Sequence, residues 1–342
     1  MNPARRGVIA ALSFAALGGI TAFTLEGCAP AGEQPKAAAA DPAELNFSIL
    51  SAESQSQGQA DWAPLLADMQ KAIGIPVKPF FASNYTGLIE AMRFNQVQAG
   101  WFSALPALET TRRANAEVVG RFVSTTGQDT YESVLIVKKG SGITLQDVLA
   151  CGKKYTFGLG DVKSTSGTLA PTAFLFVPNN IDPQDCFKVV RSASHAANLA
   201  AVSAGTVDIA TNNSVGLNNP KPSNQAQIDN VEVIWRSPPI PESAIMVRKD
   251  LSPALREKIR QFFITYGQGT GPEAARQKDV MKQLTFSAFK GAGDDYLDPV
   301  RLMEATNNLA AAQKTGDAAK IAAAQKALDD IKAAIAARGT AN

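Results

Sequence analysis

The sequence predicts an α/β protein of two lobes with a ligand site between them. Segments with strand-like and helix-like patterning alternate at short spacing in two successive sets, over residues 45–123 and 144–212. Such alternation is typical of a mostly parallel sheet covered by helices on both faces. Strand-like passages join the two sets and indicate a hinged molecule. In sheets of this kind, ligands bind at the carboxyl ends of the strands, to which helix N-termini point.

The first set begins with the strand-like run "LNFSILS" at residues 45–51. Residues 61–74 then carry apolar side chains at a spacing near 3.6, which predicts a helix, and "IPVKPFFA" returns to a strand pattern. The set continues with a helix at residues 85–96, a strand at 99–103, a helix at 105–115 and a strand at 117–123.

The strand-like passage "ESVLIVKKGSG" leads into the second set. It comprises a helix at residues 144–150, a strand at 155–160, a helix that begins in the run "STSG", a strand at 187–192, a helix at 195–205 and a strand at 207–212. A polar loop at residues 218–229 and strand-like segments at 231–237 and 238–250 follow.

These elements divide the chain into lobes. We expect lobe 1 to consist of residues 44–134 and 245–342, and lobe 2 of residues 135–244. Residues 298–339 are rich in alanine and are interrupted at Gly316, which predicts a helical hairpin on the surface. Its small apolar residues could pack on the first lobe or on a second copy of the chain, so a homodimer is one of two alternatives.

Composition excludes several functional classes. A length of 342 residues suffices for two domains, and a net charge of +2 with dispersed basic residues predicts no nucleic-acid partner. The sequence has no Cys-x-x-Cys motif and no Cys/His cluster, so we expect neither a metal site nor a cofactor. The motifs G-x-S-x-G, H-E-x-x-H and the P-loop are also missing, which favours binding over catalysis.

The N-terminus has the pattern of an export signal. Arg5 and Arg6 precede a long uncharged apolar run, and a segment rich in alanine, proline and glutamine follows it. We therefore predict a signal peptide at residues 1–27 and a tether at residues 28–43; the alternative is a transmembrane anchor. The run "LEGC" is similar to a bacterial lipobox, which predicts lipidation of Cys28 and a membrane-tethered periplasmic protein.

Export also changes the interpretation of the other two cysteines. Cys151 and Cys186 would lie in an oxidising compartment, where disulfides form. Each stands shortly before a strand-like run, "YTFGLG" and "FKVVRS". If those strands are neighbours in one parallel sheet, the two thiols lie at the same edge and can form a disulfide; the alternative is two unrelated buried thiols.

A run of hydroxyl residues is the strongest candidate site. "GDVKSTSGTLAP" begins at Gly160 and places Ser164, Thr165 and Ser166 at the start of a helix. A helix start needs only one capping hydroxyl, so three exceed the requirement of a cap. Hydroxyl donors beside unpaired backbone N–H groups form a receptor for a small tetrahedral oxyanion. The simpler alternative is a polar loop with one cap.

Other candidates lie at corresponding strand ends. His195 is the only histidine of the chain and opens the helix after "FKVVRS", where it can donate to an anion; elsewhere a lone histidine is more often a surface or capping residue. Tyr85 opens the helix after "FFAS", and Phe102 ends the strand "AGWF". Both lie at strand ends of the first lobe and face the predicted cleft, although aromatic residues at strand ends are as often core residues.

A secreted hydrolase is the rival hypothesis. Its nucleophile would be one serine of the "STSG" run, paired with the lone His195. Such an enzyme would need one activated serine and would leave the other hydroxyls without a role. Binding explains all three.

Several segments together closely resemble the periplasmic phosphonate- or phosphite-binding proteins of ABC transporters. The resemblance extends from Leu45 to Phe289 and rests on the run from "SAESQSQGQADW" to "QAGWFS" and on "GDVKSTSGTLAP", "SHAANLAAVSAGTVDIATNN" and "VIWRSPPIP". It implies a type II periplasmic-binding-protein fold, a small phosphorus oxyanion as ligand, and delivery to the permease and ATPase subunits of an ABC importer.

The resemblance also implies roles for single residues. In the family the "STSG" segment grips the phosphonate oxygens, so Ser164, Thr165 and Ser166 inherit that role. The histidine of "H-x-x-N" corresponds to His195. Two pocket tyrosines correspond to Tyr85 and to Tyr131 in "TYESVLIV".

Three positions depart from relatives that bind aminoalkylphosphonates. Val215 and Ser243 stand where those relatives carry the acids that meet the ammonium group of the ligand. Phe102 replaces a tyrosine and lacks its hydroxyl. Glu242, next to Ser243, could return a carboxylate to the pocket. We therefore expect phosphite or a phosphonate with an uncharged tail, such as methylphosphonate, as the ligand.

Overall fold

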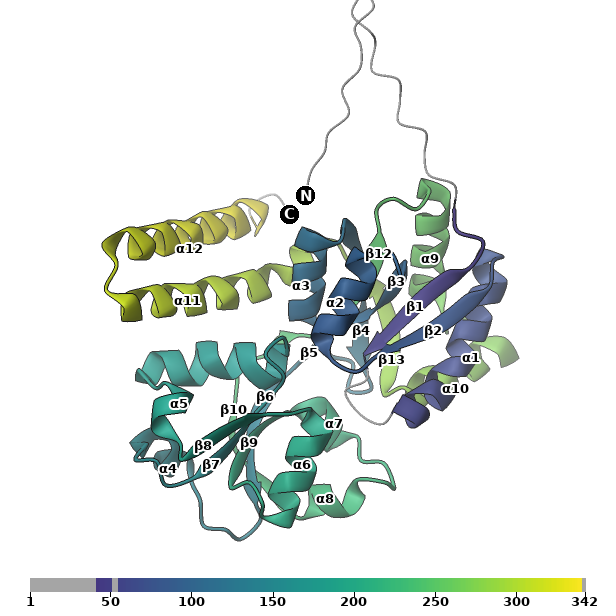
Figure 1. Ribbon diagram of the computed structural model, residues 1–342. Coiled ribbons are helices and arrows are strands. Elements are labelled where there is room, and N and C mark those ends of the chain that lie inside the picture. The colour runs from purple at the N-terminus through teal and green to yellow at the C-terminus, as the bar shows by residue number, and fades with distance from the viewer. Residues whose placement is uncertain (1–40, 51–54, 340–342) are drawn as a thin grey trace, which may run out of the picture. The chain divides into compact units, whose positions relative to one another are not determined.

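The computed structural model describes residues 41–50 and 55–339 (Figure 1). The predicted signal peptide, Cys28 and most of the tether lie outside these residues. Within the described part of the chain, no helix combines the length and the hydrophobicity needed to span a membrane.

A six-stranded sheet forms the first lobe. Its strand order is β13-β4-β12-β3-β1-β2. The strands are β1 (Leu45–Leu50), β2 (Val77–Ala82), β3 (Ala99–Phe102), β4 (Ala116–Ser124), β12 (Ala244–Arg248) and β13 (Phe286–Gly291). The pairs that β1 forms with β2 and β3 are parallel, and those that involve β12 or β13 are antiparallel.

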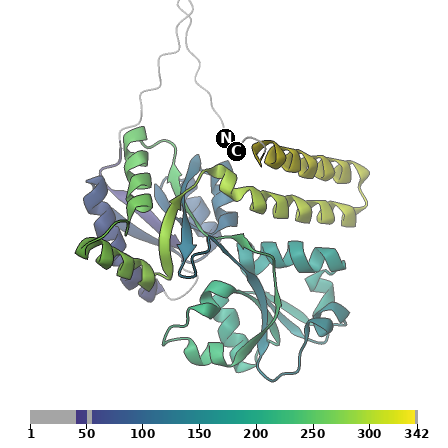
Figure 2. The ribbon, with the colours of Figure 1, turned by 180° about the vertical axis from the view of Figure 1, so that it is seen from behind.

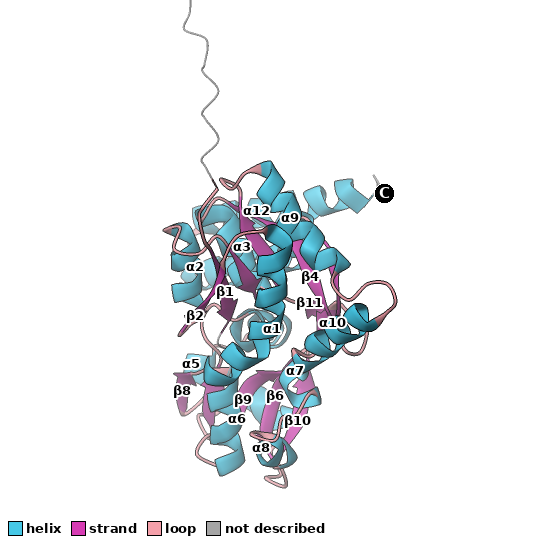
Figure 3. Cartoon of the chain, turned by 90° about the vertical axis from the view of Figure 1, so that its right-hand side faces the viewer, coloured by secondary structure: helices cyan, strands magenta, loops and turns pink. Residues whose placement is uncertain are grey.

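Helices cover both faces of this sheet (Figures 1 and 3). Against one face lie α1 (Gln55–Ile73), α9 (Pro253–Thr265) and α10 (Pro272–Gln283), which share an aromatic core that contains Phe47, Trp62 and Phe263. Against the other face lie α2 (Tyr85–Arg93) and α3 (Ala104–Arg113), packed with Leu88 and Phe102. The two clusters place apolar side chains on both sides of the sheet, and the inner strands β3 (AGWF) and β12 (AIMVR) are accordingly almost entirely apolar.

A five-stranded sheet forms the second lobe, in the order β10-β6-β9-β7-β8. The strands are β6 (Ser133–Lys138), β7 (Thr156–Leu159), β8 (Val189–Ser192), β9 (Ile209–Asn213) and β10 (Val231–Arg236). The helices around them are α4 (Leu145–Ala150), α5 (Pro183–Cys186), α6 (His195–Ala204), α7 (Ser214–Asn218) and α8 (Gln225–Asp229). Residues 165–179 form a further helical segment, with π-helical turns at Thr165–Leu169 and Thr172–Phe176 and a 3-10 turn at Val177–Asn179.

Both sheets are mixed, so the prediction of mostly parallel sheets was only partly right. The parallel pairs come from the alternating sets. The antiparallel pairs involve β6, β10 and β12, which adjoin the passages between the sheets, and β13, which follows α10. The predicted polar loop at residues 218–229 is also partly wrong, because it contains α8. The segment at residues 251–297, for which we predicted no elements, contains α9, α10, β13 and the 3-10 turn Asp294–Leu297.

Two short strands mark the passages between the sheets. β5 (Thr130–Tyr131) pairs with β11 (Ile240–Pro241) in an antiparallel ladder. The chain passes from β4 through β5 to β6, and it returns from β10 through β11 to β12. We call this β5–β11 ladder the hinge ladder.

The C-terminal segment is a helical hairpin, as predicted. Helices α11 (Asp298–Thr315) and α12 (Ala318–Gly339) lie side by side (Figures 1 and 2), and Gly316, with φ of 67°, ends α11. Arg338 of α12 forms an ion pair with Asp298. Asn307 of α11 donates a hydrogen bond to the carbonyl oxygen of Leu169, so α11 packs against the 165–179 segment of the second lobe.

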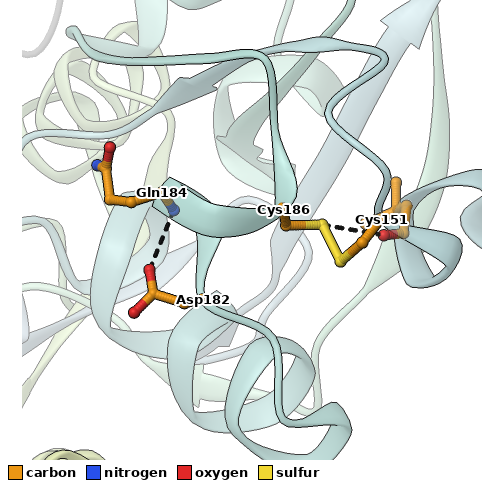
Figure 4. The surroundings of a disulfide bond; sticks show 5 residues. Cys151, Asp182, Gln184 and Cys186 are labelled. Atoms are coloured by element: carbon orange, nitrogen blue, oxygen red, sulfur yellow. Dashed lines mark hydrogen bonds between the residues drawn. A yellow bond between two sulfur atoms is a disulfide. The ribbon is translucent and has the colours of Figure 1, made fainter.

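A disulfide bond joins Cys151 to Cys186 (Figure 4). Cys151 follows α4 and Cys186 ends α5. The strands that follow them, β7 and β8, are parallel neighbours, so the two cysteines reach the same edge of the sheet. Nearby, Asp182 accepts a hydrogen bond from the backbone N–H of Gln184, which caps the start of α5.

Candidate functional site

A cavity of about 170 Å³ lies between the two sheets. Its lining comes from both lobes and from the hinge ladder. This volume is below the roughly 300–1,000 Å³ of pockets that take drug-sized molecules, which suits a small solute. Its lining includes Asp61, Tyr85, Trp101, Ser103, Tyr131, Ser166, His195, Val215, Lys221, Glu242 and Ser243.

The hydroxyl run follows the carboxyl end of β7, where the alternation predicts a site. Gly160 and Gly167 are in close backbone contact, because a Cβ on Gly160 would lie 2.4 Å from the Cα atom of Gly167. The N–H of Gly160 donates to the carbonyl oxygen of Gly167 at 3.0 Å. Only glycine permits this approach, so the two glycines hold the start of the 165–179 segment against the end of the strand.

The three hydroxyls of the run point in different directions. Ser164 Oγ accepts from the backbone N–H of Gly167 at 2.9 Å, which is the contact of an N-cap. Ser166 lines the cavity, and its Oγ lies 3.1 Å from His195 Nε2. Thr165 is fully buried and does not line the cavity; its contacts lie across the cleft.

His195 is the first residue of α6 and lines the cavity. Asn198, one turn later, donates to the carbonyl oxygens of Gly158 and Thr211 and so anchors α6 to β7 and β9. Burial lowers the pKa of His195 to about 4, so the ring is neutral at pH 7. Its Nδ1 atom is buried and has no hydrogen-bond partner among the described residues. A neutral imidazole can still donate one N–H to an anion.

Two tyrosines contribute phenol groups. Tyr85 opens α2, where Asn84 caps the helix, and Tyr131 lies in the hinge ladder. Burial raises the pKa of Tyr85 to about 12, an effect that a hydrogen bond with Ser164 partly offsets. Burial and the neighbouring Glu242 carboxylate raise the pKa of Tyr131 as well. Both phenols therefore stay protonated at neutral pH and can donate to an oxyanion.

A carboxyl group also reaches the cavity. Val215 and Ser243 line it, and so does Glu242, which is 5% exposed. Glu242 Oε1 accepts from the N–H and the hydroxyl of Ser243, at 2.9 and 3.1 Å. Its Oε2 atom is buried without a partner among the described residues, and burial raises the pKa of this carboxyl.

Three predicted ligand residues, Phe102, Ser164 and Thr165, do not line the cavity. Phe102 is fully buried among the residues of the α2–α3 face. Its neighbours Trp101 and Ser103 line the cavity instead. Successive side chains of a strand point to opposite faces, which explains why Trp101 and not Phe102 faces the ligand site. The alternation in "AGWFS" predicts that Trp101 and Phe102 point to opposite faces, but it does not predict which of the two faces meets the cavity.

An ion pair between the two lobes forms part of the cavity wall. Lys221, from the segment between α7 and α8, donates to Asp61 of α1 at 2.8 Å, and both residues line the cavity. The pair joins the two lobes beside the ligand site. Sequence analysis missed it, because the residues are 160 positions apart and no local pattern connects them.

Comparisons with known proteins agree with this architecture. The family model of periplasmic substrate-binding proteins of phosphonate ABC transporters matches residues 47–297. A phosphonates-binding periplasmic protein of Escherichia coli K12 is 42% identical over 295 residues, which cover 86% of this chain and 83% of that protein.

Solved structures extend the comparison. The binding-protein component of an ABC phosphonate transporter from Pseudomonas aeruginosa superposes with a TM-score of 0.81 at 36% identity, over 87% of this chain and 99% of that one. A Prochlorococcus marinus protein in complex with methylphosphonate has a TM-score of 0.67 at 18% identity, over 77% and 97% of the two chains, and shares the fold. With its two-lobe fold and a family model that matches most of its length, the chain belongs to the periplasmic substrate-binding proteins of phosphonate ABC transporters.

Proposed function

We propose that this protein captures a small phosphorus oxyanion, with methylphosphonate or phosphite as the preferred ligand, in the cavity between its lobes. One observation carries the proposal: a serine hydroxyl, a neutral imidazole and two protonated phenols line the same small cavity. Hydrogen bonds to a desolvated anion are stronger than those between neutral groups, so a few of them suffice for tight binding.

The ligand oxygens would be held mainly by Ser166 and His195, whose side chains are already 3.1 Å apart. Tyr85 and Tyr131 would donate from the first lobe and the hinge ladder. Ser164 would act through its cap and its contact with His195, at 3.4 Å from the ring. Closure of the lobes formed by residues 44–134 with 245–342 and by residues 135–244 would remove the ligand from water.

The tail of the ligand is proposed to be uncharged. Val215 provides an apolar wall, and Ser243 uses its hydroxyl to donate to Glu242. A buried ammonium group needs an ionised carboxylate, because an unpaired buried charge is heavily penalised. Glu242 is the carboxyl closest in sequence to the lost acids, but burial disfavours its ionised form. An aminated ligand would therefore have to displace a proton from Glu242 before it gained an ion pair.

Membership in this family argues against the hydrolase hypothesis, since its members are binding components of transporters. We propose that the chain is exported, that Cys28 tethers it to a membrane, and that it delivers its ligand to the permease and ATPase subunits of an importer. The alanine-rich face of α12 supports a homodimer through the C-terminal hairpin, because most of its side chains are exposed.

A thermal-shift panel tests the proposal. The mature protein is mixed with phosphite, methylphosphonate, phosphate, aminoethylphosphonate and sulfate. A ligand at one hundred times its Kd should stabilise the fold by about 2.7 kcal/mol. We expect methylphosphonate or phosphite to exceed aminoethylphosphonate in affinity by at least tenfold. Stabilisation by none of the phosphorus compounds would contradict the proposal.

A pair of substitutions tests the specificity. Val215→Glu with Ser243→Asp restores carboxylates at the two positions that lack them. This variant should shift preference toward aminoethylphosphonate, whereas Val215→Leu with Ser243→Ala serves as the uncharged control. An unchanged preference in the acidic variant would show that other residues line the tail pocket.

A further inference from the structure

Thr165 makes hydrogen bonds to the opposite lobe. Its Oγ1 atom accepts from the backbone N–H of Leu105 at 2.8 Å and lies 2.8 Å from the Oγ atom of Ser103. Ser103 is the N-cap residue of α3, yet its own side chain makes no capping hydrogen bond. An N-cap hydroxyl normally accepts from the second or third N–H of its helix, and Leu105 holds the second. Thr165 of the second lobe therefore caps a helix of the first.

The surroundings of Thr165 determine which of the two hydroxyls donates the hydrogen bond between Thr165 and Ser103. A threonine hydroxyl has one hydrogen, and Thr165 is completely buried. One of its lone pairs accepts from Leu105, and Ser103 Oγ is the other hydrogen-bond partner described for it. Buried hydroxyl hydrogens are almost always donated. The hydrogen of Thr165 therefore goes to Ser103, which leaves the hydrogen of Ser103 to point elsewhere.

The hydroxyl hydrogen of Ser103 can therefore be donated to a ligand in the cavity. Ser103 lines the cavity together with Ser166 and His195. Tyr131 lines the same cavity, and its interactions with Ser166 and Ser103 partly offset the rise in the pKa of its phenol. A hydroxyl of the first lobe thus faces the oxyanion-binding groups of the second.

We propose that Ser103 is a ligand-binding residue and that Thr165 is its positioning residue, which orients the Ser103 hydroxyl and does not itself contact the ligand. This inference rests on the proposed function of the cavity. A second contact supports the same pairing of elements, since Lys163 forms an ion pair with Glu109 of α3. The chain is thereby joined to α3 both at Thr165 and two residues before it. Ligand binding and contact between the lobes would then depend on the same hydrogen bonds.

The test is a double-mutant cycle on the full mature chain, with calorimetric titration of methylphosphonate. Ser103→Ala should weaken binding by about 10- to 100-fold, as expected for a hydrogen bond to a charged group. Thr165→Val, which keeps the shape and removes the hydroxyl, should weaken it by a similar factor. Thr165→Ser is the matched control and should bind as the unmodified protein does. The double variant should be no more than about twofold weaker than Thr165→Val alone, because the two residues act as one unit.

Three results would overturn the inference: a Thr165→Val variant with unchanged affinity, multiplicative losses in the double variant, or a Thr165→Ser variant as weak as Thr165→Val. Hydrogen exchange at the Leu105 amide provides a readout without ligand. Thr165→Val should accelerate that exchange and Thr165→Ser should not, and equal exchange in both would refute the cap. If the unmodified protein binds no phosphorus oxyanion while the exchange result holds, the proposed function fails and the cap across the lobes stands.

Discussion

Acidification should destabilise the folded protein through His195. The ring lines the cavity, and burial lowers its pKa from the ordinary 6.5 to about 4. It is the only imidazole in the chain, so its titration can be observed without overlap. The perturbation is therefore a change of pH from 7 to 4.5, with His195→Gln as the variant that cannot take up the proton.

The sign follows from the order of protonation. The folded pKa lies below the unfolded value, so the unfolded chain binds the proton first as the pH falls. The stability linked to His195 is complete above a pH of about 6.5 and is lost progressively as the pH falls toward 4. At 1.36 kcal/mol for each unit, the difference between 6.5 and about 4 sets an upper limit of about 3.4 kcal/mol. Because the ring is partly accessible from the cavity, we expect a loss of about 2 kcal/mol.

Two measurements decide this prediction. Nuclear magnetic resonance should give a pKa well below 6.5 for the single imidazole of the ligand-free protein. Urea unfolding at both pH values should show a smaller acid loss in His195→Gln than in the unmodified protein. Methylphosphonate should raise the imidazole pKa, because a bound anion favours the charged ring. An ordinary pKa in the free protein, or equal acid losses in the two proteins, would refute the reasoning.

Other substitutions have separate expected outcomes. Ser166→Ala should weaken methylphosphonate binding by about 1.5–3 kcal/mol in calorimetry, and an unchanged affinity would remove this hydroxyl from the site. The double variant Cys151→Ser with Cys186→Ser should lose about 3–4 kcal/mol of unfolding free energy, because the disulfide closes a loop of 35 residues. Mass spectrometry of the intact, alkylated, unmodified protein should find no free thiol at these two positions. Glu242→Gln should raise the unfolding free energy at pH 8 but not at pH 4, since burial disfavours the ionised form of this carboxyl; equal effects at both pH values would contradict that cause.

Local patterns predicted much of the fold. The apolar spacing in "YTGLIEAM" and the short apolar run in "ESVLIV" are properties of neighbouring residues, and both segments adopt the predicted structure as α2 and β6. The disulfide was also predictable, because position relative to consecutive strands determines which edge of a parallel sheet a residue reaches. The antiparallel pairing of β12 and β13 was not, because strand direction depends on how the chain returns to the first sheet and no local pattern encodes that path.

The candidate site was predictable in its chemistry and less so in its geometry. The hydroxyl run and His195 come together as the order of strands implies. The choice of Trp101 over Phe102 depends on which face of β3 meets the cavity, and sequence alternation alone does not say which face that is. The contact of Lys221 with Asp61 depends on two lobes that meet only in the folded chain.

The three consecutive hydroxyls of the "STSG" run have three different partners, because Ser164 is an extended N-cap residue and Thr165 and Ser166 are successive residues of the helical turn that follows it. Ser164 accepts from the N–H of Gly167 within its own turn, Thr165 accepts from Leu105 of the opposite lobe, and Ser166 faces the cavity beside His195. One short segment thus contributes to local folding, to contact between the lobes and to the ligand site. Loss of each hydroxyl should consequently have its own most direct readout: helix stability for Ser164, exchange at the Leu105 amide for Thr165, and ligand affinity for Ser166. Loss of the Thr165 hydroxyl should weaken binding only through Ser103. A single cap would need only the first of these groups, so the other two are explained by contacts outside the helix they begin.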